Sequence, residues 1–164
     1  MSMHALDQPA NHAMARGRLA GAPRILVVDD DPLQRTLIMR AAKSAGYLAT
    51  AATSCAEAIE LLMREQFSCM TLDLGLEDGD GLDVMEQMTK AACQVPVIVI
   101  SGMGALWRRT SRARARELGI DMLQSFHKPV DLAALRIALA NLRSANAGLP
   151  NMHWLGEIRT LEIA

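Results

Sequence analysis

The chain has 164 residues, with 17 Lys and Arg residues against 18 Asp and Glu residues, so its formal net charge is −1. A chain of this length usually forms one domain and buries roughly 70% of the surface that its unfolded form exposes. With 51% hydrophobic residues it needs neither disulfides nor a structural metal, and its charge excludes a strongly basic nucleic-acid carrier or a polybasic membrane binder as its overall character.

The two ends of the chain differ from its middle. Residues 1 to 22 show no helical or strand period, which predicts a disordered N-terminal arm before a domain over residues 23 to 143. Residues 144 to 164 are expected to form a linker and a short C-terminal element. If that element is helical, it carries one apolar stripe and is expected to pack on the domain or on a second copy in a homodimer. The stripe consists of Trp154, Leu155, Ile158 and Leu161.

The domain begins with a strand and a helix. The apolar run of residues 25 to 28 predicts a strand and stops at three aspartates. Asp31 and Pro32 then supply an N-cap and a first helical residue. The helix is expected to end at Gly46, since glycine readily takes the positive φ that ends many helices.

Two further strands follow. Residues 47 to 51 predict a weak strand, and Ser54 with Glu57 predicts a capping box that opens a second helix. Residues 69 to 72 predict a third strand that runs into Asp73. The glycine-rich and aspartate-rich residues 75 to 81 are typical of a loop.

The second half of the domain repeats the same alternation. A helix is expected over residues 82 to 92, and residues 95 to 100 form an unbroken β-branched run that is typical of a buried parallel strand. A helix over 105 to 118, a strand over 122 to 126 and a last helix capped by Asp131 follow. Five strand-then-helix units predict an α/β fold with a doubly wound parallel sheet.

The cysteines and the hydropathy of the sequence indicate the cellular compartment of the protein. The three cysteines, Cys55, Cys69 and Cys93, are odd in number and contain no CxxC pair, which fits reduced thiols better than disulfides or a zinc site. The sequence contains neither a run of 18 apolar residues nor a signal-peptide pattern. We therefore expect a cytoplasmic protein with no membrane partner.

Reactive side chains follow four of the five predicted strands. The carboxyl ends of parallel strands meet at one edge of a sheet, where ligands of α/β proteins bind. Any one such aspartate is more often a turn or cap residue, but the joint pattern favours a site. The residues are Asp29, Asp30, Asp73, Ser101 and Lys128.

Three carboxylates at one edge repel each other unless a cation neutralises them, and Mg²⁺ prefers such oxygen ligands. A carboxylate beside Mg²⁺ can attack an activated phosphoryl group, because the metal screens the charges of both. We therefore expect Asp73 to be a nucleophile, with Lys128 and the Ser101 hydroxyl binding the phosphoryl oxygens.

These segments resemble the receiver domain of two-component response regulators. The resemblance covers about residues 24 to 143 and rests on residues 25 to 32, 72 to 82, 97 to 102 and 127 to 129. It implies a flavodoxin-like (βα)5 sheet with strand order 2-1-3-4-5. It also implies a signalling module rather than an enzyme, which accepts a phosphoryl group from a histidine kinase or phosphotransfer protein and acts on a downstream protein target.

The resemblance also implies a role for each site residue. Asp73 is the phosphoryl acceptor, while Asp29 and Asp30 hold Mg²⁺ or Mn²⁺ together with the backbone carbonyl of Gly75. Ser101 is the switch hydroxyl. Lys128 pairs with the phosphate and is followed by a cis peptide bond.

Two features depart from the usual receiver pattern. The family commonly has an aromatic residue three positions before the lysine, but Ser125 stands there, so Phe126 is expected to replace it in the switch. Residues 101 to 128 form a longer segment than usual. Its last part, residues 119 to 129, is similar to receivers fused to EAL-type cyclic-diguanylate phosphodiesterases.

Alternatives remain at this point. The fold also fits a phosphorylation-independent pseudo-receiver or scaffold. An aspartyl-phosphate phosphatase needs a second aspartate two residues after the acceptor, where Gly75 stands. The basic helix that carries Arg108, Arg109 and Arg112 fits either a solvated face or an output surface for an acidic partner, and direct nucleic-acid binding is not expected.

Overall fold

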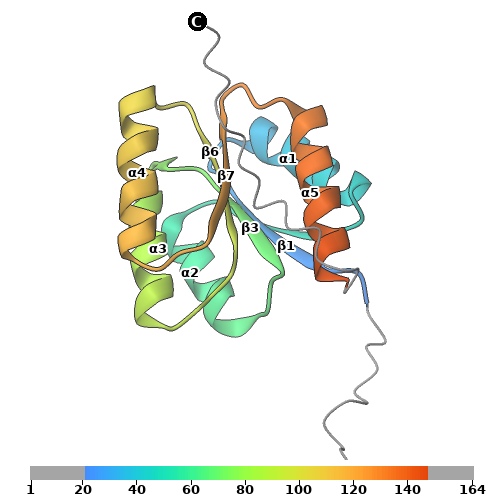
Figure 1. Cartoon of the computed structure of the whole chain (residues 1–164), viewed down its shortest axis with the longest axis horizontal. Helices are drawn as coiled ribbons and strands as arrows, with labels where there is room; N and C mark the ends of the chain where they lie inside the picture. The colour runs from blue at the N-terminus through green and yellow to red at the C-terminus, as the bar shows by residue number, and fades with distance from the viewer. Residues whose placement is uncertain (1–20, 148–164) are drawn as a thin grey trace, which may run out of the picture.

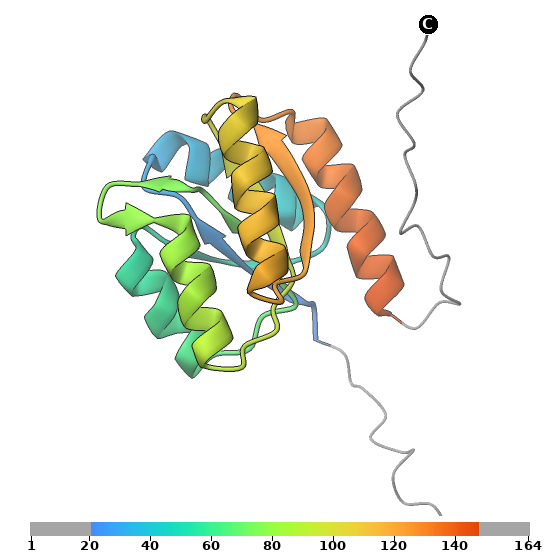
Figure 2. The same cartoon turned by 60° about the vertical axis from the view of Figure 1, so that its left-hand side comes forward.

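The computed structural model describes residues 21–147. It contains one five-stranded parallel sheet with helices on both faces (Figures 1 and 2). Most of the predicted N-terminal arm, and the whole of the predicted C-terminal element, lie outside the described residues. In the described part, no helix is long and apolar enough to cross a membrane.

The sheet confirms the predicted strand order. Its strands lie in the order β2-β1-β3-β6-β7, and every neighbouring pair is parallel. Between β3 and β6, two very short strands form an antiparallel hairpin where the sequence predicts a loop. The strands are β1 (Arg24–Val28), β2 (Leu48–Ala52), β3 (Cys69–Leu72), β4 (Gly75–Leu76), β5 (Gly79–Asp80), β6 (Val97–Ser101) and β7 (Met122–His127).

Helices cover both faces of the sheet, with α1 and α5 on one face and α2, α3 and α4 on the other (Figure 1). Successive side chains of a strand point to opposite faces, so β1 and β6 contribute to both apolar cores. This explains their continuous apolar runs. The helices are α1 (Pro32–Ser44), α2 (Cys55–Arg64), α3 (Gly81–Lys90), α4 (Ala105–Glu117) and α5 (Leu132–Asn146).

Two boundaries differ from the sequence prediction. Helix α5 ends at Asn146, beyond the predicted domain end at residue 143, while its packing on the α1 side reaches only Leu142. At the start of α2, the Ser54 side chain caps the helix as predicted, but the Glu57 carboxylate accepts hydrogen bonds from Thr53 instead of completing the box with Ser54.

The β4–β5 hairpin also caps α2, although the two are far apart in the sequence. The Asp78 carboxylate accepts hydrogen bonds from the backbone N–H groups of Cys55, at 2.8 Å, and Ala56, at 3.2 Å. These amides are among those that a helix leaves without an internal partner. Asp78 therefore connects the loop after β3 to the first turn of α2.

Asp78→Ala is expected to lower the free energy of unfolding by about 1 kcal/mol, as the loss of a helix cap does. The hydrogen bond from Cys55 is the largest cause that holds the pKa of Asp78 below its ordinary value of 3.8. The folded state therefore binds this proton more weakly than the unfolded state, so the stabilisation is present above pH 3.8 and is lost as the pH falls through the folded pKa.

Urea unfolding of both proteins across this pH range measures the effect. Glu77→Ala is the control, because it removes a neighbouring exposed carboxylate of the same hairpin and keeps the Glu77 backbone N–H. An equal loss in both variants would show that Asp78 acts only through overall charge.

Candidate phosphoryl-acceptor site

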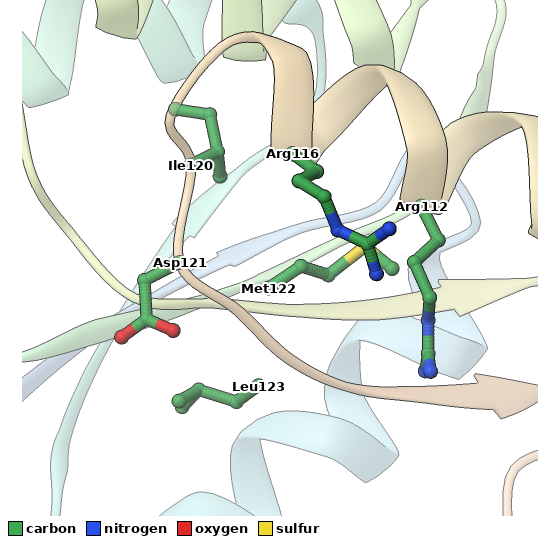
Figure 3. A pocket seen from close by; sticks show the side chains of 6 residues that line it. All are labelled: Arg112, Arg116, Ile120, Asp121, Met122 and Leu123. Atoms are coloured by element: carbon green, nitrogen blue, oxygen red, sulfur yellow. The ribbon is translucent and has the colours of Figure 1, made fainter.

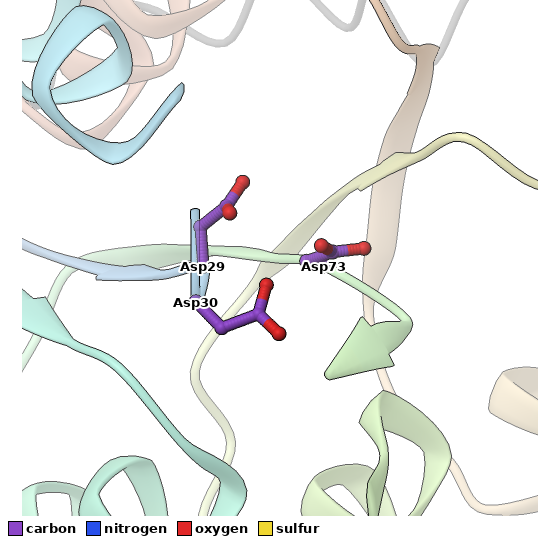
Figure 4. A group of neighbouring side chains, drawn as sticks. All are labelled: Asp29, Asp30 and Asp73. Carbon is purple, nitrogen blue, oxygen red and sulfur yellow. The ribbon is translucent and has the colours of Figure 1, made fainter. Parts of the chain in front are cut away.

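Three aspartates meet at the carboxyl edge of the sheet. Asp29 and Asp30 directly follow β1, and Asp73 directly follows β3, the neighbouring strand (Figure 4). One carboxylate oxygen from each lies within 4.8 Å of the others. Asp29 and Asp73 are buried, and Asp30 is partly exposed. The structure thus brings together the acidic residues that the sequence predicts.

Lys128 neutralises part of this charge. Its ammonium group donates a hydrogen bond to Asp73 Oδ2 at 2.6 Å and forms an ion pair with Asp29 Oδ2 at 3.0 Å. Burial raises the pKa of Asp29, and this effect exceeds the opposing effect of Lys128. Burial lowers the pKa of Lys128, but the hydrogen bonds and charges of Asp73 and Asp29 bring it above its ordinary value. The lysine is therefore held charged inside an acidic site.

Ser101 is the last residue of β6 and is completely buried. Its hydroxyl oxygen accepts a hydrogen bond from the Met103 backbone N–H at 3.1 Å. Its carbonyl accepts one from the Lys128 N–H at 3.0 Å, so the serine and the lysine are joined through the backbone. The peptide bond between Lys128 and Pro129 is cis, as the resemblance implies.

The β4–β5 hairpin supplies two contacts that sequence reasoning missed. The Gly75 N–H donates to Asp73 Oδ1 at 3.0 Å, and the Glu77 N–H donates to Asp30 Oδ2 at 3.0 Å. Gly75 thus touches the acceptor through its amide, while metal binding by its carbonyl stays a prediction. The only signal was the loop composition of residues 75 to 81, which does not show where an amide points.

The donor set fits a hard divalent cation. Three carboxylates share one edge, and a single lysine balances only part of their charge. Oxygen ligands in such a cluster suit Mg²⁺ or Mn²⁺, which keep several waters and need few protein ligands. Asp29, Asp30 and Asp73 are the residues that would hold the ion. A bound cation there would screen the charges of a carboxylate and an approaching phosphate.

The position of Phe126 does not support its predicted switch role. The ring is buried in the α1–α5 core with Ile98 and Ile100 of the neighbouring strand. Side chains alternate along β6, so Ser101 belongs to the opposite face, together with Val99. The two residues are therefore separated by the sheet itself. This position does not favour the expectation that Phe126 replaces the aromatic residue that is missing at position 125, and its switch role stays a prediction.

The arginines of α4 have different surroundings. Arg108 donates to the Met103 carbonyl at 3.3 Å and so contacts the loop beside Ser101, whereas Arg109 is exposed. Arg112 lines a cavity near the other end of the helix. Arg114 is paired with Glu86 of α3 at 2.7 Å. The predicted basic surface therefore exists, but only part of it is free of acidic partners within residues 21–147.

Comparison with known proteins agrees with this geometry. Residues 25–140 match the family described as Response regulator receiver domain. The chain is 34% identical over 117 residues to the response regulator protein PilR of Pseudomonas aeruginosa. It is 29% identical over 136 residues to the transcriptional regulatory protein GlrR of Escherichia coli. These matches cover 71% and 83% of this chain but only 25% and 30% of those relatives.

Solved structures show the same fold. A response regulator receiver protein from Pseudomonas putida aligns with a TM-score of 0.62 at 30% identity, over 75% of this chain and 98% of that one. A CheY-like receiver domain protein from Methanospirillum hungatei aligns with a TM-score of 0.67 at 22% identity, over 77% and 98%. The sheet order, the acidic edge and these matches together show that the chain belongs to the receiver domain family of two-component response regulators.

Proposed function

We propose that this chain accepts a phosphoryl group on Asp73 in a Mg²⁺-dependent or Mn²⁺-dependent reaction, with a histidine kinase or phosphotransfer protein as donor. The observation that carries this proposal is the placement of Asp73. It is buried beside two further carboxylates, and it contacts the ammonium group of Lys128 at 2.6 Å. In this arrangement the Asp73 carboxylate pairs with the Lys128 ammonium group, and the two neighbouring carboxylates could hold a metal ion beside it.

The proposed reaction is a single displacement. An oxygen of Asp73 attacks the phosphorus of the donor phosphohistidine, and a phosphorus–oxygen bond forms while the phosphorus–nitrogen bond breaks. The imidazole nitrogen leaves with the bonding electron pair and takes up a proton from solvent. Lys128 and the Ser101 hydroxyl are placed to pair with the phosphoryl oxygens, once Ser101 releases the Met103 amide.

A phosphoryl-transfer assay combined with a beryllofluoride titration tests the proposal. A phospho-accepting receiver takes up one phosphoryl group per chain from acetyl phosphate and binds beryllofluoride in the presence of Mg²⁺. A scaffold does neither, and a phosphatase turns over exogenous substrate repeatedly. The proposal therefore assigns the protein to signalling rather than metabolic catalysis, and repeated turnover would contradict it.

Asp30→Ala is expected to weaken Mg²⁺ binding at least ten-fold, because one of three charged ligands is lost. The Asp30 carboxylate also accepts the Glu77 amide at 3.0 Å, so the variant is expected to loosen the hairpin. Titration of Mg²⁺ followed by amide NMR signals measures both effects. The control Asp31→Ala removes the neighbouring N-cap carboxylate of α1 and keeps the backbone N–H of residue 31 that donates to Asp29 Oδ1. Equal affinity in Asp30→Ala and wild type would remove Asp30 from the metal site.

We further propose that output occurs in the cytoplasm through protein contacts rather than by direct binding to nucleic acid. The exposed Arg109 of α4, which does not line the cavity near the other end of the helix, supports an acidic protein target. GlrR carries the name of a transcriptional regulatory protein, and this chain matches only 30% of it. Gel-shift assays of the phosphorylated chain against mixed duplex DNA test this part, and saturable binding would contradict it.

A finer proposal concerns the subgroup of receiver domains to which this chain belongs. Residues 119 to 129 resemble receivers that are fused to EAL-type phosphodiesterases, which suggests an output that controls cyclic diguanylate hydrolysis. Adding the phosphorylated chain to an EAL-type phosphodiesterase from the same organism tests this assignment. A hydrolysis rate that changes with phosphorylation supports it, and an unchanged rate contradicts it.

A further inference from the structure

A cavity of about 320 Å³ lies between α4 and β7, and we call it the α4–β7 cavity. It occupies the amino edge of the sheet, where β7 begins, and is therefore remote from the acidic site at the carboxyl edge. Two arginines, one aspartate and three apolar side chains form its walls (Figure 3). They are Arg112, Arg116, Ile120, Asp121, Met122 and Leu123.

The two arginines of this cavity form no ion pair with residues 21–147. Arg112 and Arg116 are one turn apart on α4 and project toward the strand that carries Met122 and Leu123 (Figure 3). Neither guanidinium forms an ion pair within the described part of the chain, whereas Arg114 of the same helix pairs with Glu86 and Glu117. The floor of the cavity is partly apolar, and 38% of Leu123 is exposed. A complementary ligand would carry two negative charges, one positive charge and apolar side chains.

We propose that residues 148–164 of the same chain dock in the α4–β7 cavity. This segment carries Glu157, Arg159 and Glu162, which is the charge complement of the two arginines and one aspartate of the cavity. It also contains Trp154 and Ile158, which can cover apolar surface that water otherwise contacts. The proposal concerns a surface remote from Asp73 and goes beyond phosphoryl acceptance.

The topology brings this segment to the correct edge. Each helix returns from the carboxyl edge to the amino edge of a parallel sheet, so α5 ends at Asn146 on the same edge as the α4–β7 cavity (Figure 1). Strand β7 is the outermost strand of the sheet, with α4 and α5 on its two faces. The segment has to pass only around this one strand.

The length of the segment is sufficient. The seven residues from Gly148 to Trp154 span at most about 25 Å when extended. A domain of this size has a radius of gyration of about 14 Å. The path around β7 is therefore within reach, and the charged residues after Trp154 would arrive at the cavity.

The experiment uses the full chain labelled with 5-fluorotryptophan. The sequence contains two tryptophans, and Trp107 in α4 serves as an internal reference for Trp154. We expect the fluorine signal of Trp154 to differ from that of the free synthetic peptide of residues 148–164. Arg112→Glu with Arg116→Glu is expected to reduce the docked fraction about ten-fold, since two ion pairs are replaced by repulsion.

A charge exchange separates docking from misfolding. Adding Glu157→Arg and Glu162→Arg to the double arginine variant is expected to restore the docked signal, and the control Arg40→Glu on α1 is expected to leave it unchanged. The proposal is overturned if the fluorine signal of Trp154 equals that of the free peptide, or if it does not change with the arginine substitutions. A signal that depends on protein concentration, with a doubled mass in light scattering, also overturns it in favour of a second copy as the occupant.

Discussion

Asp73→Asn is expected to abolish phosphoryl acceptance. The amide oxygen that replaces the carboxylate is neutral and is a much weaker nucleophile, and Asp73 lies nearer to the Lys128 ammonium group, at 2.6 Å, than Asp29 does, at 3.0 Å. Incubation with acetyl phosphate and Mg²⁺, followed by mass determination, measures the effect. The wild-type chain is expected to gain one phosphoryl group, and the variant none.

The matched control for this experiment is Asp121→Asn, which changes an exposed carboxylate at the amino edge of the sheet. It is expected to accept a phosphoryl group at the wild-type rate. The neighbouring carboxylates Asp29 and Asp30 provide the competing explanation, because either could act as a secondary acceptor. A base-labile phosphoprotein that forms in Asp73→Asn at the wild-type rate would show that the acceptor is assigned wrongly.

Gly81→Ala is expected to lower the free energy of unfolding by about 1–3 kcal/mol, the usual cost of adding a methyl group to a packed site. A Cβ at this position would lie 2.7 Å from the backbone oxygen of Asp73 and 2.9 Å from the Cα of Leu74. Both atoms belong to the backbone, so no side-chain rotation relieves the clash. The first residue of α3 would have to move away from the acceptor loop.

The same substitution is expected to reduce the phosphorylation rate by at least ten-fold, because displacement of the reacting group by about 1 Å can cost roughly a factor of 100. Urea unfolding and the acetyl phosphate assay measure the two effects. Gly102→Ala is the control, since its Cβ would have its nearest neighbour at 4.0 Å. Equal stability of Gly81→Ala and Gly102→Ala would show that the contact between α3 and the acceptor loop relaxes freely.

The sequence by itself determined the order of the elements and the members of the acidic edge. Apolar runs and helix caps are local signals, and Asp31, Ser54 and Asp131 cap their helices as predicted. Asp29, Asp30 and Asp73 could be placed together without coordinates, because parallel strands bring all their carboxyl ends to one edge. Lys128 follows the same rule through β7.

The face of the sheet on which a side chain lies was decided by the tertiary structure. Phe126 is only one residue closer to Lys128 than position 125, so the sequence alone suggests it as a substitute for the missing aromatic residue. The register of β7 against β6 pairs Ile100 with Phe126 and directs the ring into the α1–α5 core. A shift of one residue along a strand exchanges the two faces, so proximity in sequence does not establish the role.

Contacts between distant segments were also decided only in three dimensions. The Glu77 amide donates to the carboxylate of Asp30, which follows β1, and the Asp78 carboxylate caps α2, which precedes β3. Each of these bonds needs the hairpin to fold back over the sheet edge. Residue type predicts that an aspartate or a glycine favours a turn, but the partner of each hydrogen bond depends on how α2, β3 and α3 pack together.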